Sequence, residues 1–363
     1  MAKSPDTLIN KTAAHQINLV RYASTQAAEA IPFFEQLIDY INARLMREGE
    51  SIASKKRLRA VLHDVESKMD QLLGAYSSQI QGLARPIAQQ EIEFNEQMIA
   101  ATVEDYSVVV PTIEKAITAI YSNPLLIGSG GGAVSFKELT ESWTAPEIKR
   151  VAQRISSGFY LGETPTQIAR AISGTKRNGY KDGLLEISRR AAQTMAKTAV
   201  MDMATQAKTA FNLANDDLMV GEEVVATLDS RTSPYCQAHD GKVYLYADGP
   251  FPRPPFHLNC RSTLSPVLSP EFDFTREGRT RPAVGEGGAQ RVDAGTSYYE
   301  WLKSQPQSVQ DDALGPTKAD IFRNAGLSAE EFRKAATVGL NQPLTIDLLR
   351  SRNKEIAQYL DNE

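Results

Sequence analysis

Up to about residue 125, apolar residues recur with the period of an amphipathic helix. One apolar stripe covers residues 33–45, and a second covers residues 58–76 and continues toward Leu83. Pro86 is expected to end or kink the second helix, because proline removes a backbone N–H and clashes with the preceding turn. The stretch 87–103 is polar enough to predict a helix that is exposed or faces a partner. The N-terminal third is therefore predicted to consist of long helices.

The helical pattern breaks at Asn123-Pro124 and at Gly128–Gly132, which are typical of a hinge or linker. A long helix with alanine-rich faces is predicted from Gly183 to about Leu213. Between the breaks and this long helix, the pattern predicts short helices at residues 136–142, 146–156 and 165–173.

The best strand candidate is residues 223–228, and residues 242–246 form its expected hairpin partner because Asp240-Gly241 is a strong turn signal. The segment Gly249–Pro255 carries four prolines and is expected to be irregular. The Gly- and Arg-rich stretch Thr275–Gly288 is typical of an exposed loop. The last 70 or so residues return to the apolar spacing of short helices.

These elements predict a mainly α fold with a small β-containing α+β C-terminal domain. Long N-terminal amphipathic helices come first, followed by a helical lead-in and a short hairpin with an irregular Cys/His loop. The expected divisions are a helical region, a domain that holds the hairpin, and a C-terminal block of loop and short helices packed on that domain, at residues 1–127, 133–268 and 269–363.

The sequence has 363 residues, with 40 Lys and Arg against 44 Asp and Glu, so its formal net charge is −4. With so small a net charge, the electrostatic field of the whole molecule does not attract it to nucleic acid. No apolar run approaches the ~20 residues of a membrane helix, and the first residues lack the apolar core of a signal peptide. Two cysteines do not make a disulfide framework, so a reducing compartment is expected, in which a Cys/His cluster favours a metal.

Both cysteines and two of the four histidines fall in one short stretch, as Cys236-Gln-Ala-His239 and His257-Leu-Asn-Cys260. Each half pairs a thiol with an imidazole across a two-residue gap, so one tight turn can present both donors to one ion. Two such turns supply the four ligands of a tetrahedral structural zinc site. Four protein ligands leave no open coordination position, which catalysis needs. The predicted zinc is therefore structural and would hold the irregular loop 247–256 in place.

Alternatives to metal binding remain open. Cys236 and Cys260 are also consistent with two small buried hydrophobic residues or with a local thiol pair, and His257 with a hydrogen-bonded histidine in a proline-rich loop. Asp229 and Arg231, at the end of the predicted strand, are favoured as a turn-stabilising pair over a ligand site. Arg261 either orients a carboxylate, touches a phosphate or forms a surface salt bridge.

The remaining candidate residues give weaker evidence for a functional site. His15 and His63 are interpreted as ordinary helix residues, since His15 has no nearby acid–base partner in sequence and His63 has no companion histidine at a recognisable spacing. The basic run 55–59 fits DNA phosphates or an acidic partner, but such runs are more often solvated helix faces. Gly128–Gly132 lacks the Gly-Lys-Ser/Thr ending of a phosphate loop.

Several of these motifs together resemble the signature of the phage Mu F-like head-morphogenesis family of minor head proteins. They are the Asp229-Ser-Arg-Thr turn, Cys236, Gly241 and the Pro254-Pro-Phe-His-Leu-Asn-Cys260-Arg ending. The alanine-rich lead-in helix and parts of the tail are also similar, so the resemblance covers roughly residues 135–350. The similar tail segments are Tyr299–Pro306, Val309–Asp311, Leu314–Pro316 and Pro343–Leu349.

The chain departs from the family pattern at two positions. Many members end in Cys-Arg-Cys, whereas this chain has Cys260-Arg-Ser262. The family does not fix His239, so the fourth metal ligand stays open between His239, Asp229, Asp240 and water.

The resemblance implies a non-enzymatic minor head (minor capsid) protein, present in a few copies per virion. It would lie inside the capsid near the portal, after assembly in the host cytoplasm, and act in head assembly and in the fate of packaged DNA at ejection. The implied partners are the portal protein, other head proteins and packaged DNA, with no membrane in the assembled head. Amphipathic N-terminal helices suit docking onto another helical assembly.

The alternative is an enzyme of phage origin, either ADP-ribosyltransferase-like or a metal-dependent nuclease that uses His239 and His257. Glu-x-Glu occurs only as Glu48-Gly-Glu50 and Glu91-Ile-Glu93, within the helical N-terminal third, where no catalytic loop is expected. Thiol ligands favour structural zinc over hydrolytic magnesium.

Overall fold

The computed structural model describes residues 8–103, 106–128, 131–272 and 280–362. The chain forms two compact units. Unit 1 comprises residues 1–20, 86–134 and 201–363, and unit 2 comprises residues 21–85 and 135–200. This division differs from the domain boundaries expected from sequence, because α1 (Leu8–Ala28) and α9 (Leu184–Ala214) each contribute residues to both units.

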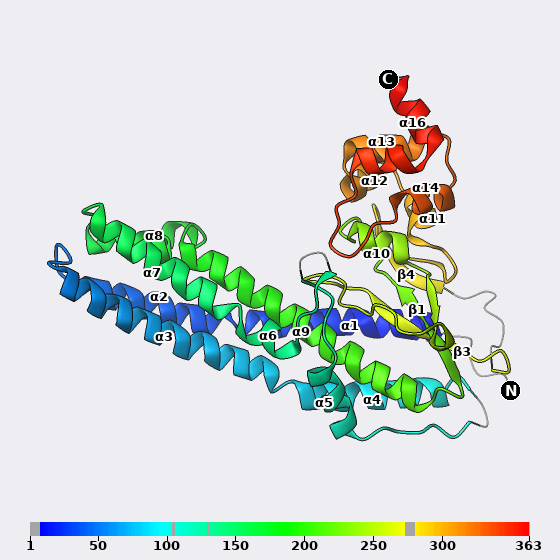
Figure 1. Cartoon of the computed structure of the whole chain (residues 1–363), viewed down its shortest axis with the longest axis horizontal. Helices are drawn as coiled ribbons and strands as arrows, with labels where there is room; N and C mark the ends of the chain where they lie inside the picture. Colours follow the sequence, from blue (N-terminus) through cyan, green and yellow to red (C-terminus); the bar gives the residue numbers. More distant parts are fainter. Residues whose placement is uncertain (1–7, 104–105, 129–130, 273–279, 363) are drawn as a thin grey trace. The chain divides into compact units, whose positions relative to one another are not determined.

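Unit 2 is helical, and its helices α2, α3, α7 and α8 lie side by side (Figure 1). Both predicted apolar stripes form the buried faces of helices, as periodicity indicated. A serine or threonine caps three of these helices by accepting a backbone N–H in the first turn. The helices are α2 (Ile31–Met46), α3 (Lys55–Gln81), α6 (Phe136–Glu141), α7 (Thr144–Tyr160) and α8 (Pro165–Ser173).

Pro86 is not the residue that ends α3. That helix stops at Gln81, and Pro86 lies in the first turn of α4 (Ala84–Ala100). A proline is tolerated there because backbone N–H groups in the first turn have no partner within the helix.

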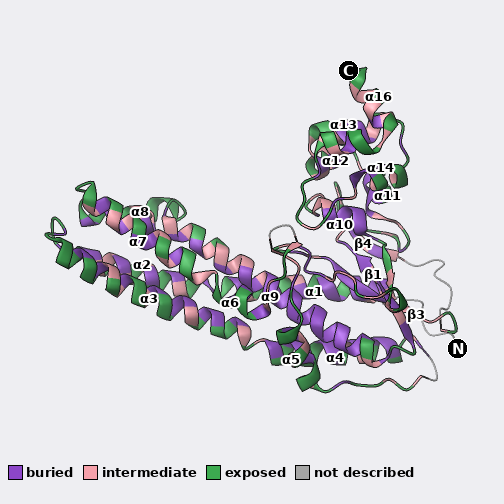
Figure 2. Ribbon diagram, in the orientation of Figure 1, coloured by how far each residue is buried: buried purple, intermediate pink, exposed green. Residues whose placement is uncertain are grey.

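The prediction that residues 87–103 form an exposed or partner-facing helix is only partly right, since α4 buries one face in unit 1 and leaves the other face exposed (Figure 2). Its polar residues have partners inside the fold. Glu91, fully buried, accepts a hydrogen bond from His15 Nε2 of α1 at 2.5 Å. The His15 ring also stacks on Phe94 at 3.7 Å between centroids. His15 therefore does have an acid–base partner, 76 residues away in sequence.

Glu91 belongs to a buried group of charged residues in unit 1, the polar seam, made of His15, Glu91, Lys208, Glu222 and Arg253. Lys208 of α9 donates to Thr263 Oγ1 at 2.8 Å. Arg253 Nε pairs with a Glu222 carboxylate oxygen at 2.9 Å. Burial lowers the pKa of Lys208, and the charges of Glu91 and Glu222 oppose that shift. The seam thus holds two carboxylates close to compensating cations, which a buried site requires.

A three-stranded antiparallel sheet follows α9, with strand order β2-β1-β3. The predicted hairpin exists, as β1 (Met219–Val225) paired with β2 (Val243–Leu245), although β1 begins and ends earlier than expected. Glycine is required at position 221, where β1 pairs with β2, because a Cβ there would lie 2.4 Å from the Tyr244 carbonyl oxygen. The strand β3 (Thr263–Leu268), unpredicted from sequence, tolerates Pro266 because it is an edge strand.

The expected exposed loop at 275–288 is in part a second hairpin. Residues 275–279 lie outside the described part, but β4 (Thr280–Gly285) pairs with β5 (Gly288–Asp293). The glycines allow the tight connection, with Gly288 at φ +94°. Val284 N donates to the Leu228 carbonyl at 2.9 Å, which joins the hairpin to the turn after β1.

The expected hinge at 128–132 falls partly outside the described residues, at 129–130. On its two sides, Leu125 and Val134 pair as an antiparallel bridge, and Gly128 N donates to the Gly132 carbonyl at 2.8 Å. The described ends of this segment therefore close into a tight loop.

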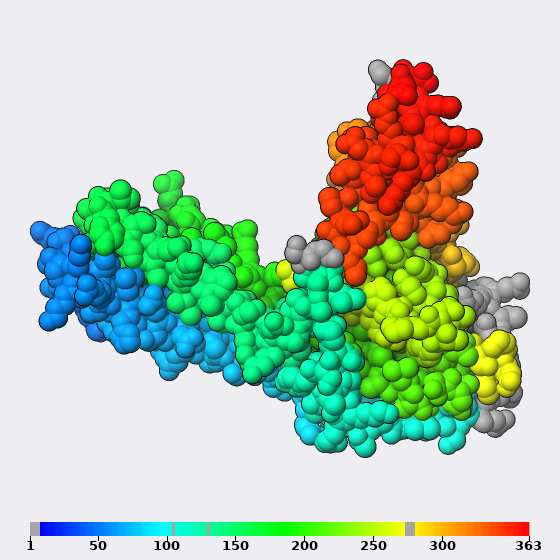
Figure 3. Space-filling model, in the orientation of Figure 1, coloured from blue at the N-terminus to red at the C-terminus, as the bar shows by residue number. Residues whose placement is uncertain are grey.

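The C-terminal helices share one hydrophobic core with the first sheet. Trp301, Phe322 and Phe332 are buried in the same cluster as Val224 and Leu228. Figure 3 shows these helices, orange to red, as one continuous packed body. They are α11 (Tyr298–Lys303), α12 (Gln307–Leu314), α13 (Pro316–Asn324), α14 (Ala329–Ala336), α15 (Ile346–Arg352) and α16 (Lys354–Asp361). Two further helices of unit 1 are α5 (Ile113–Ser122) and α10 (Pro234–His239).

The predicted fold class, mainly α with a small antiparallel β region toward the C-terminus, is confirmed. Within the described ranges, no helix combines the length and apolarity that a membrane span needs.

Replacing Lys208 tests the polar seam. Lys208→Met is expected to destabilise the protein by about 1–3 kcal/mol, because it removes the buried hydrogen bond to Thr263 and one of the cations that offset the charges of Glu91 and Glu222. The matched change Lys354→Met, at an exposed lysine of the same unit, is expected to stay within about 0.5 kcal/mol. Urea unfolding measures both, and equal effects of the two substitutions would contradict a charge-compensating role for Lys208.

Candidate metal centre

Two turns of different kinds bring the thiols together. Ser233 caps α10 by accepting the backbone N–H of Cys236, and Pro234 occupies the start of the helix, so Cys236 is fixed in its first turn. Cys260 lies in a tight turn just before β3, where its N–H donates to the His257 carbonyl at 3.1 Å. Asn259 supplies the left-handed residue of that turn, with φ +59°.

The structure gathers Cys236, His257 and Cys260, whose ligand atoms all lie within 4.8 Å of one another. The two Sγ atoms are 3.8 Å apart, and Cys236 Sγ lies 3.4 Å from His257 Nε2. Around a tetrahedral zinc with Zn–S of about 2.3 Å and Zn–N of about 2.0 Å, these separations would be about 3.8 and about 3.5 Å. The donor spacing therefore fits a single tetrahedral ion.

The charge state of the group also suits a metal. Burial opposes ionisation of Cys260, but hydrogen bonds from Cys236 and His257 outweigh it and hold the pKa of Cys260 well below its usual value. The hydrogen bond to Cys260, together with burial, raises the pKa of Cys236. Despite burial, the pKa of His257 is raised by its contact with Cys260. The shift favours the thiolate form of Cys260, which is the form that binds a metal.

The structure does not bring His239, the fourth predicted ligand, into this group. Its ring stacks on Tyr235 at 3.9 Å between centroids, and its Nδ1 lies 2.8 Å from the Tyr235 carbonyl oxygen, to which it donates. Burial lowers the pKa of His239. The Cys-x-x-His spacing is here part of a helix whose histidine packs against the preceding turn.

Neither aspartate proposed for the fourth position is free to take it. Asp229 is bound by Arg261, and Asp240 is bound by Arg281 at 3.0 Å and by the Ala226 backbone N–H at 2.8 Å. Two hydroxyls lie nearer. Ser233 Oγ is 2.8 Å from His257 Nε2, and Ser262 hydrogen-bonds to the Cys236 thiol.

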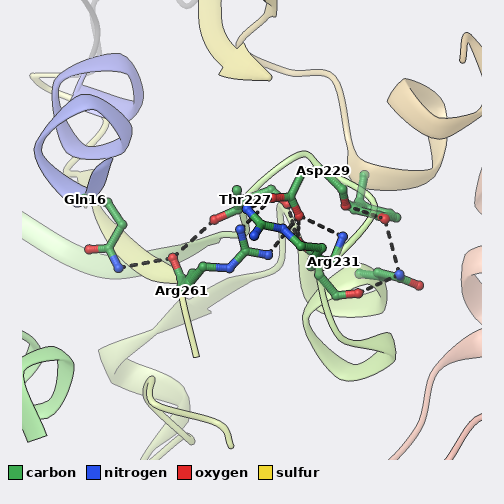
Figure 4. A network of polar contacts seen from close by, with 8 residues as sticks. Gln16, Thr227, Asp229, Arg231 and Arg261 are labelled. Atoms are coloured by element: carbon green, nitrogen blue, oxygen red, sulfur yellow. Dashed lines mark hydrogen bonds and ion pairs between the residues drawn. The ribbon is translucent and has the colours of Figure 1, made fainter. Parts of the chain in front are cut away.

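A partly buried ion pair joins Asp229 to Arg261, the residue that follows Cys260 (Figure 4). Arg261 contacts both carboxylate oxygens of Asp229, at 2.5 and 2.8 Å. Asp229 also accepts the backbone N–H of Arg231 at 3.0 Å and the Thr232 hydroxyl at 3.1 Å, which is the turn-stabilising role expected from sequence. The side chain of Arg231 is exposed. Of the roles considered for Arg261, orienting a carboxylate is the one that the contacts support.

Distant residues complete this region, and sequence offered no signal for them. Gln16 of α1 donates to the Arg261 carbonyl at 3.1 Å. The Tyr298 hydroxyl of α11 donates to the Asp229 carbonyl at 2.9 Å. Gln237 of α10 donates to the Tyr298 hydroxyl at 3.2 Å. Long-range polar contacts of this kind leave no local pattern of spacing.

A family model described as Phage Mu protein F like protein matches residues 149–265. The chain carries a phage Mu F-like domain. The match includes the three gathered donors and the Asp229–Arg261 pair, and it ends within β3. No curated protein and no solved structure matches the chain. The match covers less than half of the chain, and the likeness of this domain to the Mu F-like family points to a phage head-related protein.

The Asp229–Arg261 pair of the Mu F-like domain gives a pH-dependent stability. Burial acts to raise the pKa of Asp229, but Arg261 and the turn hydrogen bonds outweigh it, so the pKa lies below its ordinary value of 3.8. The stabilisation is therefore complete above that ordinary value and is lost as pH falls through the lower folded value.

Asp229→Asn is expected to cost about 2–4 kcal/mol at pH 7, because it leaves Arg261 without a carboxylate. The difference from the unchanged protein should narrow below about pH 4. Urea unfolding from pH 3 to 7 measures it, and a difference that stays constant across this range would contradict the ion-pair origin.

Proposed function

We propose that this chain is a minor head (minor capsid) protein, present in a few copies per virion and associated with the portal vertex inside the capsid. It acts in head assembly and in the fate of packaged DNA at ejection. The observation that carries the proposal is the Mu F-like match at residues 149–265. The partners are the portal protein and other head proteins, and packaged DNA.

Exposed apolar side chains in unit 2 support contact with other proteins. A groove of about 950 Å³ is lined by residues of α3 and α7, among them Leu62, Ile148 and Ala152. At the end of α7, Tyr160 and Leu161 are 68% and 75% exposed. These exposed apolar side chains offer a contact point for a partner.

We further propose that Cys236, His257 and Cys260 hold a structural zinc ion, with Ser262, Ser233 or water in the fourth position. The ion would fix the proline-rich segment before β3, as the donor separations support. Zinc in such a site supplies folding energy. An enzyme has weaker support. Glu91 is consumed by His15, and Glu48 pairs with Arg44 and Arg57, so neither Glu-x-Glu motif offers a free first carboxylate.

Quantitative mass spectrometry of intact and emptied phage particles tests the head role. A few copies per intact particle are expected, well below the number of major capsid subunits. Loss from emptied particles is expected for a protein that leaves with the DNA. Absence from intact particles contradicts a virion role.

Metal analysis of substituted proteins tests the zinc site. The unchanged chain is expected to retain about one zinc per chain after purification and to bind zinc more weakly as pH falls, since protons compete for the ligands. His257→Ala is expected to lower zinc affinity at least about tenfold by removing a ligand. His239→Ala, the matched histidine outside the group, is expected to retain zinc.

The reverse change offers an independent test. Ser262→Cys places a third thiol beside Cys236 and is expected to raise zinc affinity, because thiolate is a stronger zinc ligand than a hydroxyl or water. Zinc loss in His239→Ala together with retention in His257→Ala would overturn this ligand assignment.

A further inference from the structure

The small net charge of the chain conceals two oppositely charged units. Unit 2 carries 20 Lys and Arg against 14 Asp and Glu, a formal charge of +6, while unit 1 carries 20 against 30, a formal charge of −10. Any attraction to a polyanion therefore belongs to unit 2. Which part of unit 2 carries it depends on where the cations lack carboxylate partners.

The connection between α8 and α9, the basic loop (residues 174–183), carries such cations. Lys176, Arg177 and Lys181 are all exposed. None of the three side chains forms a hydrogen bond or ion pair with a described residue. The acidic residue of the loop, Asp182, is exposed as well, but donors of the loop itself bind its carboxylate. It accepts the Thr175 backbone N–H at 2.7 Å and the Asn178 side-chain amide at 2.8 Å.

The basic loop is also rigid. Its two ends meet so closely that a Cβ on Gly183 would lie 2.3 Å from the Gly174 nitrogen. Gly174 adopts φ +81°, which favours glycine. Lys176–Asn178 forms a short 3₁₀ helix, and Tyr180 N donates to the Thr175 carbonyl at 2.9 Å. The cations therefore stand on a preformed backbone, which lowers the entropy cost of binding.

Some other basic residues of unit 2 have carboxylate partners. Arg57, within the run 55–59, pairs with Glu48 at 2.6 Å. At the start of α9, Arg189 and Arg190 both pair with Glu186. Lys55, Lys56 and Arg59 of the run are exposed like the loop cations, but they lie on a helix, whereas the basic loop presents its three cations from a short backbone closed on itself.

We propose that the basic loop binds the phosphate backbone of double-stranded DNA, without sequence preference, through Lys176, Arg177 and Lys181. Duplex DNA presents one negative charge per about 1.7 Å of axis, so three cations on a short loop can meet phosphates together. Acidic protein surfaces rarely offer charge at that density. The choice of DNA as the polyanion rests on the proposed function, whereas the anion site itself rests on the loop.

Fluorescence anisotropy with a labelled 30-base-pair duplex tests the inference on the full chain. The triple change Lys176→Gln, Arg177→Gln and Lys181→Gln is expected to weaken binding at least about tenfold at low salt. It should also reduce the slope of log affinity against log salt by about 2.7, since each phosphate contact contributes about 0.9. Circular dichroism checks that the variant is folded.

The matched control removes the same charge from the same unit, as Lys55→Gln, Lys56→Gln and Arg59→Gln on α3. It is expected to change affinity less than about threefold. Equal losses in both variants, or no loss in the loop variant, would overturn the assignment to the loop. Loop-dependent binding to polyglutamate as tight as to DNA would overturn DNA as the ligand. Failure of the head role shows separately, as absence from virions while DNA binding persists.

Discussion

The segment between β2 and β3 must be held by side chains, because its backbone can do little of that work. Four prolines between Gly249 and Pro255 lack an N–H, and the described backbone bonds here are confined to short turns such as Cys260 N to the His257 carbonyl. Arg253 reaches Glu222 of the polar seam at one end. At the other end, Cys260 meets Cys236 and Arg261 meets Asp229. The placement of β3 against β1 depends on these contacts.

The same contacts collect the rest of unit 1 around the Mu F-like motif. Gln16 brings α1 to the Arg261 carbonyl, and Tyr298 brings the C-terminal helices to the Asp229 carbonyl. Cys236 and Cys260 are themselves part of the hydrophobic core that includes Trp301. A metal at the three donors would therefore stabilise a junction between the sheet, α10 and the C-terminal block. This supports a structural reading of the group more than a catalytic one.

Sequence predicted whatever depends on local spacing. The stripes of α2 and α3, the β1–β2 hairpin and the pairing of Cys236 with His257 and Cys260 all follow from periodicity or short motifs. Local spacing failed where a distant partner decided the outcome. Glu91 looked like a surface residue because its partner His15 lies on another helix. His239 was mistaken for a ligand for a different reason, since its ring stacks on Tyr235 four residues earlier in the same helix. The strand β3 was likewise missed, because Pro266 argues against a strand unless it is known to lie at a sheet edge.

We propose that a metal at Cys236, His257 and Cys260 fixes the proline-rich segment. Hydrogen exchange of residues 249–262, compared between zinc-loaded and chelated full-length protein, tests this most directly. Chelation is expected to speed exchange in this segment and in α10, while exchange in α3 is unchanged. Identical exchange in the two samples, with zinc shown to be bound in the first, would contradict it.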